Sequence, residues 1–172
     1  GKVFRKAIEK GITGSLILWG PPGVGKTTLA YLIAEQVNAK VERVSAVAAG
    51  VKDLRAVIER ATQWKKLGSR TVLIIDEIHR FNKAQQDVLL PHVEDGLLTL
   101  IGATTENPYF EVIAALVSRA EVVRLEKLSD QDIVKIIKRA GFVLSKEASE
   151  LIAKLSGGDA RRALNILERA SL

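Results

Sequence analysis

The sequence predicts an α/β fold in which a parallel sheet flanked by helices is followed by a small all-helical domain. Short apolar runs alternate with segments that have helical three- and four-residue spacing, which is typical of a parallel sheet covered on both sides. From Ser129 onward, three helical segments follow with no strand between them. We therefore place an α/β domain at 1–127 and a helical domain at 128–172.

The expected strands are the short apolar runs. They cover 15–19, 41–47, 71–75, 97–103 and 121–125. The runs at 71–75 and 97–103 are apolar almost throughout, as in strands that are buried on both faces of a sheet. The run at 41–47 alternates only weakly between apolar and polar residues.

The expected helices are amphipathic segments bounded by glycine, serine or asparagine. They cover 2–10, 26–38, 51–67, 82–93, 110–116, 130–140, 146–155 and 159–170. Asn82, Ser129 and Ser145 are suitable N-caps because their side chains can accept a hydrogen bond from the first helical turn. In the helix at 26–38, we expect Leu29, Leu32, Ile33 and Val37 on the inner face.

Composition limits the classes of function. The chain has 172 residues, no cysteine and a net charge of +6. Disulfides and thiolate metal sites are therefore excluded, and a reducing compartment fits. No apolar run approaches the roughly 20 residues that cross a membrane. The charge favours an acidic partner, with nucleic acid as the first candidate, although an ordinary mixed-charge surface explains most of it. Because the chain lacks methionine and begins at Gly1, we expect an excised piece of a longer protein.

A phosphate-binding loop is predicted in 15–30, SLILWGPPGVGKTTLA. The stretch contains G-x-x-x-x-G-K-[ST], the P-loop or Walker A motif. The residues expected to bind nucleotide are Gly20, Pro21, Pro22, Gly23, Val24, Gly25, Lys26, Thr27 and Thr28. Lys26 would reach the β- and γ-phosphates, and the Thr27 hydroxyl would bind Mg²⁺. The alternative is a glycine- and proline-rich turn that precedes a helix by coincidence.

Two carboxylates, Asp76 and Glu77, follow the buried run at 71–75. Ligands of open α/β sheets bind at the carboxyl ends of the strands, so these side chains should lie near the P-loop. Asp76 would hold hydrated Mg²⁺, the Walker B role. Glu77 would orient and deprotonate the attacking water. The alternative is a pair of acidic residues in an ordinary turn.

Polar residues after the run at 97–103 are further candidates. The hydroxyl of Thr105 can contact the γ-phosphate or the attacking water, whereas capping of the next segment is an equal alternative for Thr104. Arg119 precedes the fifth strand, where it is either a surface residue or an arginine finger for a neighbouring subunit. Arg161 or Arg162, in the last helix, could face the nucleotide or simply be exposed.

The order of these motifs resembles that of AAA+ ATPases, a family whose usual sheet order is 5-1-4-3-2. The string DEIHR at 76–80 with GATT at 102–105 resembles the branch-migration motor of Holliday junctions, whereas GDAR at 158–161 is similar to the clamp-loader group. The longer strings decide between them. SAVAAGVKDLR, DEIHRFNKAQQDVLLPHVEDG and IGATTENP resemble the family of replication-associated recombination protein A, the bacterial relative of the Werner-helicase-interacting ATPase.

The resemblance implies roles for particular residues. Thr105 matches the sensor 1 position, Arg119 the arginine finger and Arg161 the sensor 2 arginine. Ser45 falls where related ATPases keep a polar residue that restrains the catalytic glutamate. His79 has no evident proton-transfer role and is expected to pack or hydrogen-bond near the Walker B turn. The expected catalytic set is therefore Lys26, Glu77, Thr105, Arg119 and Arg161, with Thr27 and Asp76 on the metal.

The resemblance also implies a biological setting. ATP and Mg²⁺ would be the cofactors, and hydrolysis would be coupled to DNA remodelling at replication forks in recombination and repair. The expected partners are fork or junction DNA, further copies of the chain as a tetramer, and single-strand-binding protein or other replication proteins, with no membrane. The expected location is the cytoplasm, associated with the nucleoid, if the source is bacterial. Family members carry an N-terminal extension and a C-terminal tetramerisation region that this chain does not contain, so we expect weak activity from the fragment alone.

Other functions remain open from the sequence. A clamp loader or a branch-migration motor would use the same ATPase site with different partners. A scaffold that binds ATP and recruits repair proteins without turnover would need neither Glu77 nor Arg119. A small-molecule P-loop kinase would need neither the Asp-Glu pair nor a helical domain that carries Gly-Asp-x-Arg.

Overall fold

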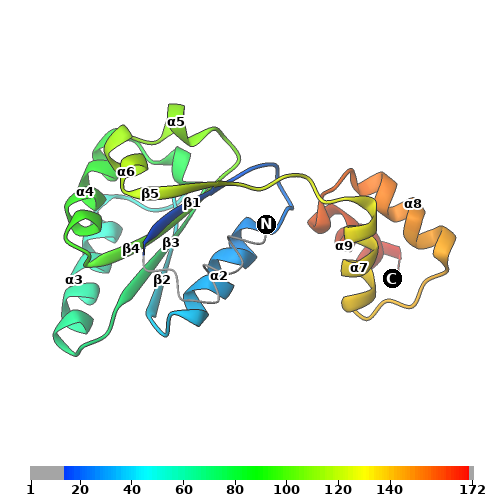
Figure 1. Ribbon diagram of the computed structural model, residues 1–172, viewed down its shortest axis with the longest axis horizontal. Coiled ribbons are helices and arrows are strands. Elements are labelled where there is room, and N and C mark those ends of the chain that lie inside the picture. The colour runs from blue at the N-terminus through cyan, green and yellow to red at the C-terminus, as the bar shows by residue number, and fades with distance from the viewer. Residues whose placement is uncertain (1–13, 171–172) are drawn as a thin grey trace. The chain divides into compact units, whose positions relative to one another are not determined.

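The computed structural model describes residues 14–170, so the helix expected at 2–10 lies outside the described residues. The elements are β1 (Ser15–Trp19), α2 (Lys26–Gln36), β2 (Lys40–Ser45), α3 (Val51–Lys66), β3 (Thr71–Asp76), the 3₁₀ turn η1 (Ile78–Arg80), α4 (Lys83–Glu94), β4 (Leu98–Thr104), α5 (Pro108–Glu111), α6 (Ala114–Ser118), β5 (Ala120–Arg124), α7 (Asp130–Arg139), α8 (Lys146–Ser156) and α9 (Ala160–Ala170). They divide into two compact units (Figure 1). The sheet unit contains the described residues 14–19 and 26–124, and the helical unit contains 20–25 and 125–170.

The sheet has five parallel strands in the order β2-β3-β4-β1-β5. This is the expected order 5-1-4-3-2 read from the other edge, so the predicted fold class is confirmed. In the pairing register, Asp76 at the end of β3 lies opposite Ala103 of β4, and Thr104 lies opposite Trp19 of β1. The carboxyl ends of the three central strands therefore meet at one edge of the sheet.

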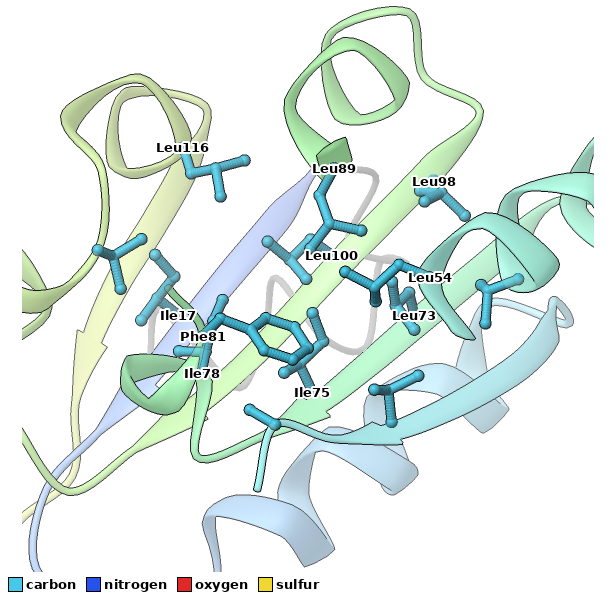
Figure 2. Close-up of a cluster of buried hydrophobic side chains, with 14 of the residues drawn as sticks. Ile17, Leu54, Leu73, Ile75, Ile78, Phe81, Leu89, Leu98, Leu100 and Leu116 are labelled. Carbon is cyan, nitrogen blue, oxygen red and sulfur yellow. The ribbon is translucent and has the colours of Figure 1, made fainter. Parts of the chain in front are cut away.

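Both faces of the central strands are buried. Ile17, Leu73 and Ile75 point into an apolar core shared with Leu54 of α3 and Leu89 of α4 (Figure 2). The alternate residues Leu16, Leu18, Val72 and Ile74 are also at most 2% exposed. Helices α3 and α4 cover one side of the sheet, and α2 covers the other (Figure 1). This two-sided burial explains why the central strands are apolar almost throughout.

The two edge strands are different in character. In β2, Lys40 and Arg43 are exposed and Glu42 is half-buried. In β5, Glu121 and Arg124 are exposed. Each edge therefore carries both signs of charge.

The burial pattern of α2 differs from the sequence-based prediction. Ala30, Ile33 and Ala34 are buried, whereas Leu32 is 53% exposed. The prediction chose the largest apolar side chains, but the face that meets the sheet is lined by two alanines. Small side chains allow a helix to approach a sheet closely, which apolar periodicity alone does not reveal.

The segment expected as one helix at 110–116 forms two short helices, α5 and α6. Asn107 caps α5 by accepting a hydrogen bond from the Tyr109 amide at 3.1 Å. Val112 is extended, with φ −106° and ψ 140°, and Ile113 begins a new turn. The buried side chain of Gln86 takes part in this break, because its Oε1 accepts from the Ile113 amide at 2.8 Å.

The helical unit has a separate core. Ile133 and Ile137 of α7, Ala153 of α8, and Ala163 and Leu167 of α9 are at most 2% exposed and pack together. Ser129 and Ser145 act as the expected N-caps, accepting from the amides of Asp132 and Ala148. The domain boundary at 127/128 remains a prediction.

Candidate nucleotide-binding site

The predicted P-loop, residues 20–25, contains a glycine that is required at its position. Gly23 has φ +69°, and a Cβ there would overlap the carboxylate of Asp159. The Gly23 carbonyl also accepts a hydrogen bond at 3.0 Å from the Ala160 amide, the first residue of α9. Gly23, Asp159 and Ala160 all belong to the helical unit. Within this unit the P-loop is thus contacted by the Asp159 side chain and the Ala160 backbone.

Thr27 and Asp76 meet although 49 residues separate them in sequence. The Thr27 hydroxyl donates to Asp76 Oδ1 at 2.8 Å. Thr27 lies in the first turn of α2, and Asp76 ends β3, so the parallel sheet brings the predicted Walker A and Walker B residues together. A hydroxyl and a carboxylate are hard oxygen donors of the type that Mg²⁺ prefers.

The second oxygen of Asp76 has a partner that the local sequence pattern does not indicate. Arg43 of β2 donates to Asp76 Oδ2 from Nη2 at 2.9 Å and from Nε at 3.2 Å. The hydrogen bond to Asp76 raises the pKa of the Arg43 guanidinium above its ordinary value. Arg43 also lies over the ring of Tyr31, 5.6 Å from its centroid, and its side chain is 57% exposed. It is an accessible counter-charge for the predicted metal ligand.

Glu77 has an uncommon backbone conformation. Its φ of 56° and ψ of 48° lie in the left-handed region, which residues other than glycine seldom adopt and which recurs at functional sites. The turn η1 follows at once, with the Arg80 amide donating to the Glu77 carbonyl at 2.8 Å. The carboxylate is 38% exposed, and the Thr105 hydroxyl is 3.5 Å from its Oε2. Glu77 and Thr105 are thus neighbours at the carboxyl edge of the sheet.

Thr104 and Thr105 have different environments. Thr104 is fully buried, and its hydroxyl accepts from the Glu106 amide at 3.0 Å and lies 2.9 Å from His79 Nδ1. Thr105 is partly exposed on the side of Glu77. Only Thr105 is therefore in a position to meet a ligand, whereas Thr104 organises the turn.

Arg119 lies at the other end of the strands, where the parallel strands begin. It caps α6 and immediately precedes β5, whose first residue pairs with Ser15 at the start of β1. The length of β1 at 3.3 Å per residue separates this edge from the carboxyl edge, a distance of about 16 Å. The Arg119 guanidinium donates instead to Glu94 Oε1, at 3.1 and 3.2 Å, in an exposed ion pair. The structure therefore does not bring Arg119 to Glu77 of its own chain.

The remaining predicted residues have simple placements. Lys26 begins α2 and is only 8% exposed, whereas Pro22 and Thr28 are exposed. Arg161 and Arg162 are exposed in the first turn of α9. Ser45 ends β2 opposite Asp76 in the pairing register and is exposed. Within residues 14–170, no group of three or more His, Cys, Asp or Glu side chains is placed to hold a metal ion.

Two contributions to the site were not predicted. They are the ion pair of Arg43 with Asp76 and the hydrogen bonds of Gln86 that brace the segment before Arg119. His79 lies near the Walker B turn as expected, with Nδ1 2.9 Å from Thr104 Oγ1 and 3.3 Å from Glu77 Oε2. Gln86 could have been suspected only as a polar residue at a position that helix periodicity turns inward, whereas the exposed Arg43 gave no local signal.

The strand, loop and helix geometry and the Thr27–Asp76 contact define a P-loop nucleotide-binding ATPase domain. Residues 16–128 match the sequence model described as the ATPase family associated with various cellular activities (AAA), and the chain belongs to this family. The family expected from the motifs is thus confirmed. In a separate respect, no helix within residues 14–170 is long and apolar enough to cross a membrane.

The chain is similar to proteins of replication and recombination. It is 55% identical over 179 residues to replication-associated recombination protein A of Escherichia coli K12, covering 98% of this chain and 40% of that protein. It is 44% identical to the ATPase WRNIP1 of Dictyostelium discoideum, covering 98% of this chain and 20% of that protein. Among solved structures, the Thermotoga maritima RuvB Holliday junction branch migration motor aligns with a TM-score of 0.78 and 30% identity, covering 96% of this chain and 57% of that one.

Proposed function

We propose that this chain binds ATP with Mg²⁺ and hydrolyses it, and that the complete protein couples hydrolysis to remodelling of DNA at replication forks. The observation that carries the proposal is the 2.8 Å contact between Thr27 and Asp76, with Glu77 next in sequence and Thr105 beside it. The predicted metal ligands and the predicted base thereby lie at one edge of the sheet.

Thr27 and Asp76 would hold the metal, and the donor chemistry fits. Bound Mg²⁺ neutralises charge on the β- and γ-phosphates during phosphoryl transfer. The Gly20–Gly25 loop would surround the phosphates with backbone amides, and Lys26 would contact the β- and γ-phosphate oxygens. Arg43 would have to share or release Asp76 when the metal binds.

Glu77 would act as the general base. Its carboxylate is partly exposed, so water can reach it, and the Thr105 hydroxyl lies on the same side. Glu77 would take a proton from the attacking water, and Thr105 would orient that water or the γ-phosphate. An ATP-binding scaffold without turnover would not require this arrangement.

Arginines would complete the site. Because Arg119 lies at the sheet edge away from Glu77, it would serve the nucleotide of a neighbouring copy rather than its own. Arg161, in the first turn of α9, would contact the phosphates; its neighbours Ala160 and Asp159 contact Gly23 of the P-loop. Such a site requires self-association, and we propose a tetramer in the complete protein.

Replication-fork DNA is the proposed target because the relatives are named for replication and recombination. The net charge of +6 agrees with an acidic partner. Single-strand-binding protein and other replication proteins are the proposed partners, and the nucleoid of a bacterial cytoplasm is the proposed location. Branch migration is the second candidate, favoured by the structural similarity to the RuvB motor.

The direct test is Glu77→Gln, which keeps the size of the side chain and removes the base. We expect ATP affinity to be unchanged and turnover to fall on the order of a hundred- to ten-thousandfold. Glu106→Gln is the matched control, because Glu106 is an exposed carboxylate at the same sheet edge. Unchanged turnover by Glu77→Gln would remove Glu77 as the base.

The role of Arg119 between subunits is tested by mixing. Arg119→Ala and Lys26→Ala proteins should each be inactive, and mixed assemblies should recover part of the activity because some sites then contain both residues. If mixed assemblies form and none of the activity returns, Arg119 does not act on a neighbour's nucleotide.

A further inference from the structure

His79 is a polar side chain beside the predicted base, and the mechanism above does not use it. Its Nδ1 lies 2.9 Å from Thr104 Oγ1 and 3.3 Å from Glu77 Oε2. The His79 side chain is only 10% exposed. One nitrogen of a nearly buried imidazole is thus placed between a hydroxyl and a carboxylate, and the location of its proton decides what it does.

The hydrogen bonds of Thr104 locate that proton. A hydroxyl has one hydrogen to donate and can accept two. Thr104 Oγ1 accepts from the Glu106 amide at 3.0 Å and can donate to the Glu106 carbonyl at 3.3 Å. One acceptor position remains, and His79 Nδ1 lies 2.9 Å from this oxygen. An N–H at Nδ1 fills that position and also faces the negative charge of Glu77, whereas a lone pair there would repel the carboxylate.

The backbone around His79 is firmly anchored. Ile78 is fully buried and packs over Gly102 of β4, where a Cβ would come within 3.1 Å of the Ile78 Cδ1 atom. Phe81, also buried, donates its amide to the Ile78 carbonyl at 3.1 Å. The position of the imidazole is therefore fixed by the core rather than by solvent-exposed contacts.

We propose that His79 is a positioning residue for Glu77, an inference that rests on the proposed ATPase function. Thr104 accepts the Nδ1–H and so fixes the tautomer of His79, and the same N–H faces Glu77 Oε2, 3.3 Å from Nδ1, as an electrostatic contact. This contact and the Thr105 hydroxyl restrain a carboxylate that has three side-chain torsions and is 38% exposed. Oε1 is then the oxygen that faces the attacking water, and restraint of this kind favours the reactive geometry.

Conservative variants distinguish positioning from packing. In His79→Asn the amide nitrogen can occupy the place of Nδ1, whereas in His79→Gln it reaches the place of Nε2, and His79→Phe keeps only the ring shape. We expect the asparagine variant to keep most of the wild-type kcat. The glutamine and phenylalanine variants should lose on the order of ten- to a hundredfold in kcat with KM unchanged. Equal losses in the asparagine and phenylalanine variants, or no loss in the phenylalanine variant, would overturn the proposal.

The tautomer can be observed without any activity. The chain has only two histidines, His79 and His92, so ¹⁵N imidazole spectra contain two sets of signals that His92→Gln assigns. At a pH where His79 is neutral, we expect the proton on Nδ1, and Thr104→Val should shift the tautomer balance toward Nε2–H. A neutral His79 with its proton on Nε2 in the wild-type protein would refute the attractive contact of Nδ1–H with Glu77.

The outcomes separate this inference from the proposed function. If Glu77→Gln abolishes turnover and His79→Phe does not, the ATPase mechanism stands and the positioning role fails. If Glu77→Gln turns over normally, the proposed base is wrong whatever His79 does. Folding of each variant is checked by Trp fluorescence, because Trp19 and Trp64 both lie in the sheet unit.

Discussion

Replacing Gln86 by leucine is expected to destabilise the sheet unit more than any surface substitution. Gln86 is 2% exposed on α4, and its side chain makes three hydrogen bonds to backbone groups. Nε2 donates to the carbonyls of Phe81 at 2.9 Å and Glu111 at 3.2 Å, and Oε1 accepts from the Ile113 amide at 2.8 Å. Leucine has a similar size but leaves all three backbone groups without this partner.

The expected loss follows from the burial of those groups. The hydrogen bond to Phe81 is buried, and a buried carbonyl left unpaired costs about 1–3 kcal/mol. The other two bonds are partly buried, so water can replace them, and each contributes about 0.5–1.5 kcal/mol. The apolar leucine offsets part of this loss. The free energy of unfolding should therefore fall by about 2–4 kcal/mol.

Urea unfolding followed by Trp fluorescence measures this change, because both tryptophans report on the sheet unit. Gln63→Leu is the matched control, since Gln63 is exposed near the end of α3 and should change stability by less than about 0.5 kcal/mol. If Gln86→Leu is as stable as Gln63→Leu, the three hydrogen bonds do not brace the segment before Arg119.

Two further predictions concern the P-loop and the metal ligand. Gly23→Ala should speed amide hydrogen exchange in the first turn of α9, because the added Cβ overlaps the Asp159 carboxylate. Gly25→Ala is the control: Gly25 has φ +91° and no atom within 4 Å of an added Cβ, so this variant should leave that exchange unchanged. Equal exchange in the two variants would refute the contact between Gly23 and Asp159. Arg43→Gln should tighten Mn²⁺ binding, measured by electron paramagnetic resonance, up to about fivefold, because an exposed ion pair contributes up to about 1 kcal/mol. Arg60→Gln is its control, since Arg60 forms a similar two-bond pair with Glu42, and weaker binding by Arg43→Gln would contradict competition for Asp76.

The local sequence was a good guide where one physical effect dominated. Continuous apolar runs predicted β3 and β4, and Asn82 predicted the start of α4, where its side chain accepts from the Gln85 amide at 2.9 Å. The P-loop pattern and the Asp-Glu pair predicted that Thr27 and Asp76 would meet, since parallel strands end at one edge.

The failures arose where tertiary contacts overrode local preference. Leu32 faces outward because alanines fit the approach of α2 to the sheet. The break between α5 and α6 coincides with hydrogen bonds from Gln86, a residue 25 and 27 positions away. The contacts of Arg43 with Asp76 and of His79 with Thr104 likewise join residues 33 and 25 positions apart, so local periodicity could not reveal them.

The charged edges of the sheet restrict how copies of the chain can associate. An exposed strand edge offers unpaired backbone groups to another chain, and alternating charges along it oppose such pairing. Lys40 and Arg43 at one edge, and Glu121 and Arg124 at the other, would bring like charges close if identical edges paired in some registers. A continuous intermolecular sheet is therefore disfavoured. The proposed assembly would depend on side-chain surfaces, and helices and loops would then set the orientation of Arg119 toward a neighbour.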